Sequence, residues 1–259
     1  MRRSIFILVI FFTYLLGACK KKDNFSVEPV SDYYPLTLGK YITYDLDSII
    51  ITNNNSLQLI QDTVHYQIQY VVSAQEVDNL NRPGYLIVRN IRTDSTVPWI
   101  TDHTAFALNT GSTIEFTEDN LKYIKLVEPI QQNFSWSGNS YIDASSLVTD
   151  VPYLSGWTYV YDSINVPITL NSLTVDSAIK VAEDNSTLGP QDHTDTFDGY
   201  DTVYSSQTYS CEKYAKGIGL VYRNFYYNIF QPRHREVPIN QDMYGYTGYG
   251  IKLTMVDHN

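Results

Sequence analysis

Most of the chain alternates apolar and polar residues with a period of two, the pattern of strands that are buried on one face only. In TVHYQIQYVV (63–72), every even-numbered position holds valine, tyrosine or isoleucine, and His65 and Gln67 occupy odd-numbered positions. Residues 173–181 and the C-terminal run 251–255 alternate in the same way. One polar face per strand predicts an antiparallel sheet with one side exposed to water. No helix longer than about two turns is expected, because no run has helical periodicity.

Short segments rich in Gly, Asn, Asp or Pro separate the alternating runs, as expected of turns. Three of them predict tight connections between consecutive strands: NLNRPG (79–84), EDN (118–120) and KGIG (216–219). In the last of these, glycine permits a positive φ or a close approach of the backbone, so a turn or a β-bulge is expected. The segment lacks the Lys-Ser/Thr ending of a phosphate-binding loop.

The expected fold is all-β, a curved antiparallel sheet that forms a barrel or half-barrel, with a two-sheet β-sandwich as the alternative. The 23 tyrosines suit half-exposed strand faces, because each has an apolar body and a polar tip. Two segments interrupt the alternation and are predicted to be irregular: 131–150, rich in Ser and Asn, and 183–201, acidic with Gly and Pro. The β-rich domain is expected to span 32–259, with a division into two lobes near 131–150 left open.

The first eighteen residues have the three parts of an export signal. Arg2 and Arg3 precede the apolar run Ile5–Leu16, and the small residues Gly17 and Ala18 follow it. The apolar run is shorter than the ~20 residues that a membrane-spanning helix needs. Removal of this segment by a signal peptidase is therefore expected.

The four residues Leu16-Gly17-Ala18-Cys19 resemble the lipobox of bacterial lipoproteins, in which a dedicated signal peptidase cleaves before the cysteine. The resemblance implies that 1–18 is removed, that the thiol of Cys19 receives a diacylglyceryl group and that its new α-amine is acylated. Each buried CH₂ contributes ~0.8 kcal/mol, so two or three chains hold a protein at a membrane permanently. Residues 19–31 (CKKKDNFSVEPVS) are polar and lack periodicity, which predicts a flexible tether.

Several short motifs also resemble a group of uncharacterised outer-membrane lipoproteins of the Bacteroidota type. They are YYPLTLGKYITYDLDSI (33–49), FSWSGNSYI (134–142), GWTYVYDSI (156–164), CEKYAKGIGLVYRNFYY (211–227) and GYGIKLTMVDHN (248–259). The resemblance implies an exported protein anchored in the outer membrane and assigns no catalytic residue. Lys22-Asp23 matches only part of the signal for display on the outer face, so both leaflets stay open.

The net negative charge of the chain bears on which macromolecules it could bind. Removal of 1–18 takes away Arg2 and Arg3 but no acidic residue, so the formal charge changes from −10 to −12. A nucleic-acid-binding protein is expected to present a basic face, so nucleic acid is not predicted as a partner. With Cys19 lipidated, Cys211 would be a lone thiol, and a buried strand residue is the expected role. A Cys19–Cys211 disulfide is the alternative that would contradict lipidation.

The acidic segment holds the only metal candidates that the sequence offers, and they are weak. They are Asp192, Asp195, Asp198 and Asp201, which recur every three residues. Several carboxylates on one loop could supply oxygen ligands for Ca²⁺, but the spacing departs from the EF-hand pattern. A solvated polar loop is favoured, and neither a metal nor a cofactor is predicted.

Enzyme motifs are absent from the sequence: it has no G-x-S-x-G, no H-E-x-x-H and no paired-cysteine metal motif. The histidines are scattered: His65, His103, His193, His234 and His258. Aromatic residues could instead bind a ligand or simply cover half-exposed strands. The candidates are Trp99, Trp136, Trp157, Tyr226 and Tyr227.

Three functions remain compatible with the sequence. The favoured one is a non-catalytic envelope protein that binds a partner protein or assists a complex. The second is a carrier or binding module for an apolar or glycan ligand, and the third is a hydrolase with a dispersed active site. A carrier requires a cavity inside the sheet, and a filled interior would exclude it.

Overall fold

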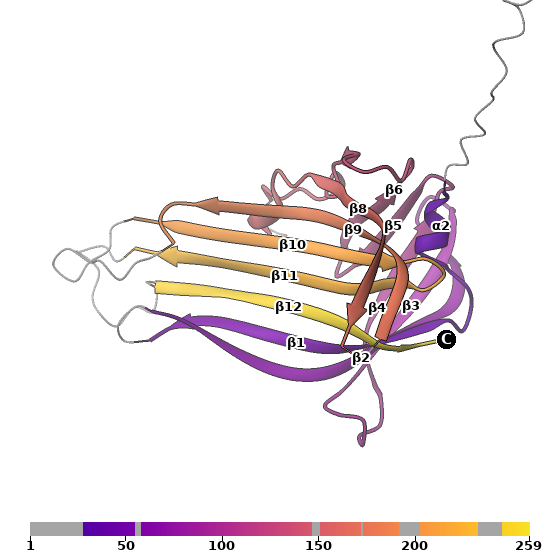
Figure 1. Ribbon diagram of the computed structural model, residues 1–259, viewed down its shortest axis with the longest axis horizontal. Coiled ribbons are helices and arrows are strands. Elements are labelled where there is room, and N and C mark those ends of the chain that lie inside the picture. The colour runs from indigo at the N-terminus through magenta and orange to yellow at the C-terminus, as the bar shows by residue number, and fades with distance from the viewer. Residues whose placement is uncertain (1–27, 55–57, 147–150, 172, 192–202, 233–244) are drawn as a thin grey trace, which may run out of the picture.

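In the computed structural model, the described residues are 28–54, 58–146, 151–171, 173–191, 203–232 and 245–259. They form one twelve-stranded antiparallel sheet in the order β6-β5-β4-β3-β2-β1-β12-β11-β10-β9-β8-β7 (Figure 1). The first six strands are β1 (Tyr41–Asn53), β2 (Leu59–Val77), β3 (Pro83–Arg92), β4 (Ile100–Asn109), β5 (Thr113–Glu118) and β6 (Leu121–Val127). The others are β7 (Ser135–Trp136), β8 (Tyr159–Leu170), β9 (Leu173–Leu188), β10 (Ser205–Ala215), β11 (Gly219–Gln231) and β12 (Gly245–His258).

The sheet curls into a nearly closed barrel, which confirms the predicted all-β curved antiparallel fold. Its two edges meet where β6 approaches β7 and the residues that follow it. Ile124 donates its backbone N–H to the carbonyl of Gly138 at 2.8 Å and accepts a bond from the indole Nε1 of Trp136 at 2.8 Å. The hydroxyl of Tyr161 in β8 bonds both backbone groups of Val127. The barrel is thus closed by a few specific hydrogen bonds rather than by a full ladder.

The predicted tight connections are confirmed. β2 and β3 form a hairpin across the turn at 79–84, and β5 and β6 form another. In the second turn, Asp119 and Asn120 take left-handed φ values of 51° and 62°, which Asn and Asp tolerate better than most residues. Between β10 and β11, Gly217 has φ 76° and Gly219 has φ 120°, as the glycines predicted.

The packed part of the chain begins earlier than the expected tether boundary at residue 31. A short helix, α2 (Val30–Tyr33), lies at the end of the barrel from which the C-terminus also emerges (Figure 1). Val30 and Tyr33 are fully buried, and Val30 N–H bonds Glu128 Oε1 at 3.2 Å. Their apolar side chains therefore belong to the core, although the preceding residues are polar. No helix among the described residues has the length and apolar character needed to cross a bilayer.

Of the two segments predicted to be irregular, 131–150 and 183–201, the structure agrees with the first over its described residues and differs for the start of the second. Between β6 and β8, the described residues contain mostly turns, the short strand β7 and a 3₁₀ turn, η1 (Pro152–Leu154). The expectation that irregular chain begins at Glu183 is wrong, because β9 continues to Leu188. Glu183 lies within the ladder between β9 and β10, next to the residue Ala182 that pairs with Cys211.

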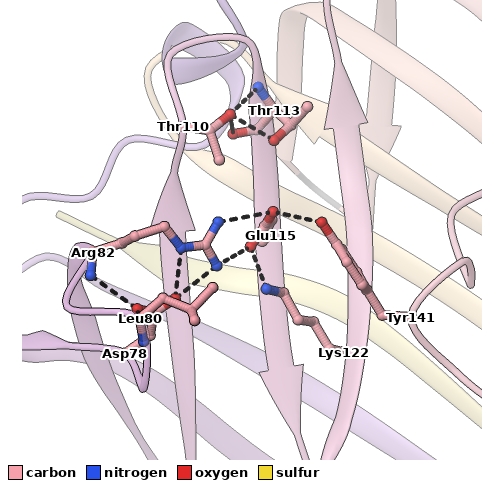
Figure 2. A network of polar contacts seen from close by, with 8 residues as sticks. All are labelled: Asp78, Leu80, Arg82, Thr110, Thr113, Glu115, Lys122 and Tyr141. Atoms are coloured by element: carbon pink, nitrogen blue, oxygen red, sulfur yellow. Dashed lines mark hydrogen bonds and ion pairs between the residues drawn. The ribbon is translucent and has the colours of Figure 1, made fainter.

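On the outer face of the barrel, Glu115 of β5 ties the β2–β3 turn to the neighbouring strand and loop (Figure 2). Its carboxylate lies 2.9 Å from Arg82 and 2.5 Å from Lys122 and accepts a hydrogen bond from Tyr141 at 3.2 Å. Arg82 also pairs with Asp78 at 2.6 Å. Attraction to Lys122 and Arg82 outweighs the opposing effect of burial and lowers the pKa of Glu115.

Candidate ligand-binding cavity

The interior of the barrel contains a cavity of about 410 Å³, within the range of small-molecule sites in proteins. Nearly every strand contributes inward-facing side chains to its wall. Most of these are aliphatic or aromatic, among them Tyr44, Leu46, Ile68, Trp157, Phe225 and Ile251. The alternation along each strand explains this wall, since successive side chains point to opposite faces of the sheet.

Four charged side chains from four strands also line the cavity, and we call them the charged cluster: Lys125 (β6), Glu183 (β9), Glu212 (β10) and Arg223 (β11). The Nζ atom of Lys125 lies 2.8 Å from Glu212 Oε1 and 3.4 Å from Glu183 Oε1. The Nε atom of Arg223 lies 3.7 Å from the same Glu212 oxygen. The cluster pairs two cations with two carboxyl groups deep inside the barrel.

The remaining carboxylate oxygens of the charged cluster are also bonded. Ser210 Oγ donates to Glu183 Oε2 at 2.5 Å, and the hydroxyl of Tyr214 donates to Glu212 Oε2. Both glutamates are thus satisfied by protein donors, as buried carboxylates need to be.

Burial and charge move the pKa values of the two glutamates in opposite directions. Burial, reinforced by repulsion from Glu212, raises the pKa of Glu183. Burial also opposes the charge of Glu212, but attraction to Lys125 and Arg223 outweighs it and lowers the pKa of Glu212. Burial works against the charges of Lys125 and Arg223, but the two glutamates outweigh it and raise both pKa values. Both cations therefore stay charged, and Glu183 is the carboxyl group that most readily takes up a proton.

Arg223 differs from the rest of the charged cluster in its exposure to the cavity. The side chains of Lys125, Glu183 and Glu212 are 7%, 2% and 1% exposed, whereas that of Arg223 is 25% exposed. The Nε atom of Arg223 is buried and donates no hydrogen bond to the described residues. Buried polar groups in proteins are nearly always hydrogen-bonded, so this Nε atom is an exception that needs an explanation.

A second polar group in the cavity wall is fully partnered. Arg89 of β3 lies 3.4 Å from Glu118 and 2.5 Å from Asp102, and Tyr70 donates to Glu118 at 3.1 Å. These contacts neutralise Arg89 with two carboxylates. Arg89 is consequently a poorer candidate for binding a ligand than Arg223.

Aromatic residues gather where the cavity reaches solvent. Tyr249 of β12 and Tyr153 line the cavity, and their hydroxyls lie 2.6 Å apart. Tyr249 is 39% exposed and pairs in the sheet with Ile50, which is 51% exposed. Ser48 of β1 lines the cavity, and its partner in the neighbouring strand β2 is Val64, which is 43% exposed. The apolar inner face of the sheet therefore continues from the cavity onto the exposed ends of β1, β2 and β12.

The anchor and metal predictions fall outside the part of the chain that the structure describes. These residues are Cys19, Asp192, Asp195, Asp198 and Asp201, together with His193 and His234. Within the described ranges, no group of His, Cys, Asp and Glu side chains is arranged to hold a metal ion. Cys211 is a free thiol, 3% exposed, in β10, and burial raises its pKa, which favours the unreactive protonated form.

The described histidines do not converge on one site. His65 of β2 lies on the outer face beside Asp47, with Nδ1 2.7 Å from the carboxylate. His103 lies beside Asp102 at 2.8 Å, and His258 is near the C-terminus in β12. His65 and His103 each have an acidic neighbour, which is typical of polar residues on the surface of a sheet.

Of the aromatic candidates, Trp157 alone lines the cavity. The guanidinium carbon of Arg92 lies over the ring of Trp99, 4.1 Å from the ring centroid. Trp136 packs against Tyr161, with 4.7 Å between the two ring centroids. Tyr226 packs on the outer apolar cluster that contains Ile51 and Phe230. The ring of Tyr227 packs against that of Tyr153 in a tilted arrangement, with 4.6 Å between the ring centroids. The described aromatic residues therefore serve mainly to pack the barrel.

Sequence patterns did contain a signal for the charged cluster, but it was missed. The alternating face of β9 runs through Ile179 and Val181 and then reaches Glu183, so the periodicity places this carboxyl group inside. Lys125 follows Tyr123 in the same way in β6. A charged residue in phase with the apolar face of a strand is costly to bury alone, and it therefore predicts a partner of opposite charge.

Comparisons of the chain with models of known protein families and with curated proteins found no match. The function therefore has to be inferred from the chemistry of the cavity and of the chain itself.

Proposed function

We propose that this protein is a non-catalytic binding protein that holds a small amphipathic molecule inside its barrel. The observation that supports the proposal is the cavity of about 410 Å³, which joins an apolar wall to a buried charged cluster. Ligand sites are typically concave and mostly apolar, with a few polar groups that orient the ligand. Among the functions that the sequence left open, a carrier or binding module fits this interior best.

An amphipathic ligand is better supported than a glycan. Sugars stack on open aromatic faces, but the ring of Trp99 is covered by Arg92 and that of Trp136 by Tyr161. Trp157 is 6% exposed, and its Nε1 donates to the carbonyl of Tyr153. The described tryptophans therefore offer little free surface to a sugar, whereas aliphatic side chains are abundant in the cavity wall.

A hydrolase receives less support from the same residues. A carboxyl pair with opposite pKa shifts, as in Glu183 and Glu212, is typical of acid–base catalysis. Both side chains, however, are at most 2% exposed, and all four oxygens are bonded by Lys125, Ser210 or Tyr214. A substrate would have to displace these donors, so a role in holding the barrel together is the simpler explanation.

We propose that lipid on Cys19 holds the binding domain at the cell envelope. Three features of the sequence support this: the export signal, the lipobox and the polar segment after it. The outer membrane is the expected bilayer, and an envelope protein is the expected partner for delivery or receipt of the ligand. Two or three acyl chains would make the attachment permanent. The membrane, and not nucleic acid, is the surface that this acidic chain would meet.

Native mass spectrometry of the Cys19→Ser chain, exported and purified without detergent, tests ligand binding. We expect a co-purifying amphiphile, or uptake of added decanol. Ile251 lines the cavity, so the larger side chain of Ile251→Trp should occupy part of the cavity and weaken decanol binding. Lys252→Trp, on the opposite face of β12, should leave decanol binding unchanged. The proposal would be contradicted if the Cys19→Ser chain, without either tryptophan substitution, bound no amphiphile.

Mass spectrometry of the mature N-terminus tests the anchor. We expect a chain that begins at Cys19 and carries a diacylglyceryl thioether and an N-acyl group. Cys19→Ser should release the protein from the membrane fraction, and Cys211→Ser, the matched control, should leave it there. A mature chain that begins upstream of Cys19, or that carries an unmodified thiol, would contradict the lipoprotein proposal.

A further inference from the structure

We propose that Arg223 binds the carboxylate of an anionic amphiphile, whose apolar chain lies along the inner face of β1 and β12. This inference rests on the proposed ligand-binding function and adds to it the chemical class of the ligand. It follows from three features of the cavity: an arginine whose buried Nε donates no hydrogen bond to the described residues, an arrangement of charge that leaves this arginine available, and an apolar path that begins beside it.

The first feature is the hydrogen-bonding state of Arg223. A guanidinium has five N–H donors and no acceptor, yet the buried Nε of Arg223 has no hydrogen-bond partner among the described residues. Its contact with Glu212 is a single 3.7 Å ion pair from Nε, too long for a hydrogen bond. The planar guanidinium matches a carboxylate with two parallel hydrogen bonds, which is the arrangement best suited to satisfy it.

The second feature is the distribution of charge around Arg223. Glu212 is already bound by Lys125 and Tyr214, and Glu183 is bound by Ser210 and Lys125. A proton on Glu183 leaves two cations facing a single carboxylate, so the charged cluster then has a positive charge that a ligand anion can neutralise. Burial and the neighbouring Glu212, which raise the pKa of Glu183, favour this protonated form.

The third feature is the apolar path next to Arg223. Phe225 is two residues further along β11 and lines the same cavity. It pairs with Ile251, and the next inward position of β12 holds Tyr249 opposite Ile50. Side chains in this row pass from buried to about half exposed, so a chain that starts at Arg223 has apolar contacts as far as the solvent.

Arg89 is the other arginine of the cavity, and it is a weaker choice. Two carboxylates, Asp102 and Glu118, already lie within 3.4 Å of its guanidinium nitrogens. An anion at Arg89 would meet repulsion from both of them. Arg223 therefore carries the proposal.

Binding of a matched pair of probes, decanoate and decanol, to the Cys19→Ser chain tests the inference. Calorimetry should give tighter binding of decanoate than of decanol, because only decanoate can accept the guanidinium hydrogen bonds. Arg223→Met should weaken decanoate binding roughly 10- to 100-fold, the value expected for hydrogen bonds to a charged group, and leave decanol binding unchanged. Arg92→Met, which removes a guanidinium from the outer face, is the matched control and should change neither.

Two further variants separate recognition from folding. Arg223→Lys keeps the charge but not the planar fork, so it should lose part of the decanoate affinity. Arg223→Met combined with Glu212→Gln keeps the cluster balanced and should lose as much decanoate affinity as Arg223→Met alone. Equal binding of decanoate and decanol to the parent chain, or a parallel loss of both in the balanced variant, would overturn the role of Arg223. Absence of binding of either probe to the parent chain would instead overturn the proposed function itself.

Discussion

Lys125 of β6 and Glu212 of β10 meet inside the barrel, with Nζ 2.8 Å from Oε1, although 87 residues separate them in the chain. β6 is an edge strand of the sheet, and β10 is the fourth strand from the opposite edge. The ion pair therefore crosses the interior and joins parts of the sheet that no ladder connects. A buried pair of this kind adds little stability over a well-packed apolar pair, but the loss of one partner is costly.

Lys125→Met should destabilise the protein by about 3–5 kcal/mol, because it leaves two buried carboxyl groups with Arg223 as the remaining cation of the charged cluster. Denaturant unfolding at neutral pH measures the change. Lys252→Met is the control, since Lys252 is on the outer face and 43% exposed. That substitution should change the free energy of unfolding by less than about 0.5 kcal/mol. Equal effects of the two substitutions would show that the charged cluster does not stabilise the fold.

Glu212→Gln should lower stability most at neutral pH and progressively less in acid. The pKa of Glu212 in the folded protein is below the ordinary glutamate value of 4.5. Its stabilising effect is therefore complete above that value and is lost as the pH falls through the folded pKa. Unfolding of both chains between pH 7 and pH 3 should show the difference in stability shrinking. A difference independent of pH would contradict the lowered pKa.

Glu183→Gln should have the opposite pH dependence. The pKa of Glu183 is raised above 4.5, so the folded state retains a proton that the unfolded state has already lost. The stability that this group contributes is complete below 4.5 and declines as the pH rises through the folded pKa. Glutamine stays neutral and avoids the decline, so the substituted chain should gain stability relative to the parent from pH 5 to pH 8. Unfolding of both chains between pH 4 and pH 8 checks this, and parallel curves would contradict it.

Alternation along the sequence predicted several of the strands, their solvent-exposed face and several turns, because each of these depends on neighbouring residues. The hairpin of β5 and β6 is an example, since Asp119 and Asn120 signal its turn locally. The pairing of β1 with β12 has no local signal, because it joins Ile42 to His258 from opposite ends of the chain. The closure of the sheet depends on such long-range pairs.

The charged cluster shows a second limit of prediction from one sequence. Each member is a charged residue on the otherwise uncharged inner face of an ordinary strand, and a partner becomes visible only when strand order is known. Glu183 was assigned to an irregular segment because 183–201 is acidic and contains Gly and Pro, although its position in the alternation was that of a buried residue. Local composition was the wrong guide there, and periodicity was the right one.

Glu115→Gln tests the outer-face network of Figure 2. The substitution removes the charge that Arg82 and Lys122 share, so it should cost about 2 kcal/mol at neutral pH, typical of hydrogen bonds to a charged group. The lowered pKa of Glu115 predicts that this cost diminishes as the pH falls below 4.5. Glu76→Gln, at an exposed position of β2, is the control and should be nearly neutral. A cost that persists unchanged in acid would mean that the charge of Glu115 is not what holds the turn.

Gly138→Ala tests how the barrel is closed. A Cβ atom at this position would lie 2.4 Å from the ring of Tyr159, closer than real contacts allow. Tyr159 is fully buried and its hydroxyl donates to Asn139, so the ring cannot move aside freely, and the backbone bond from Ile124 to Gly138 should break instead. We expect a loss of about 1–3 kcal/mol from overpacking and faster hydrogen exchange of the Ile124 amide. Ser140→Ala, at an exposed position two residues further along the same loop, is the control. Faster exchange at Ile124 in the Gly138 variant but not in the Ser140 variant would identify this contact as the closing point of the sheet, and unchanged exchange in both would place the closing point elsewhere.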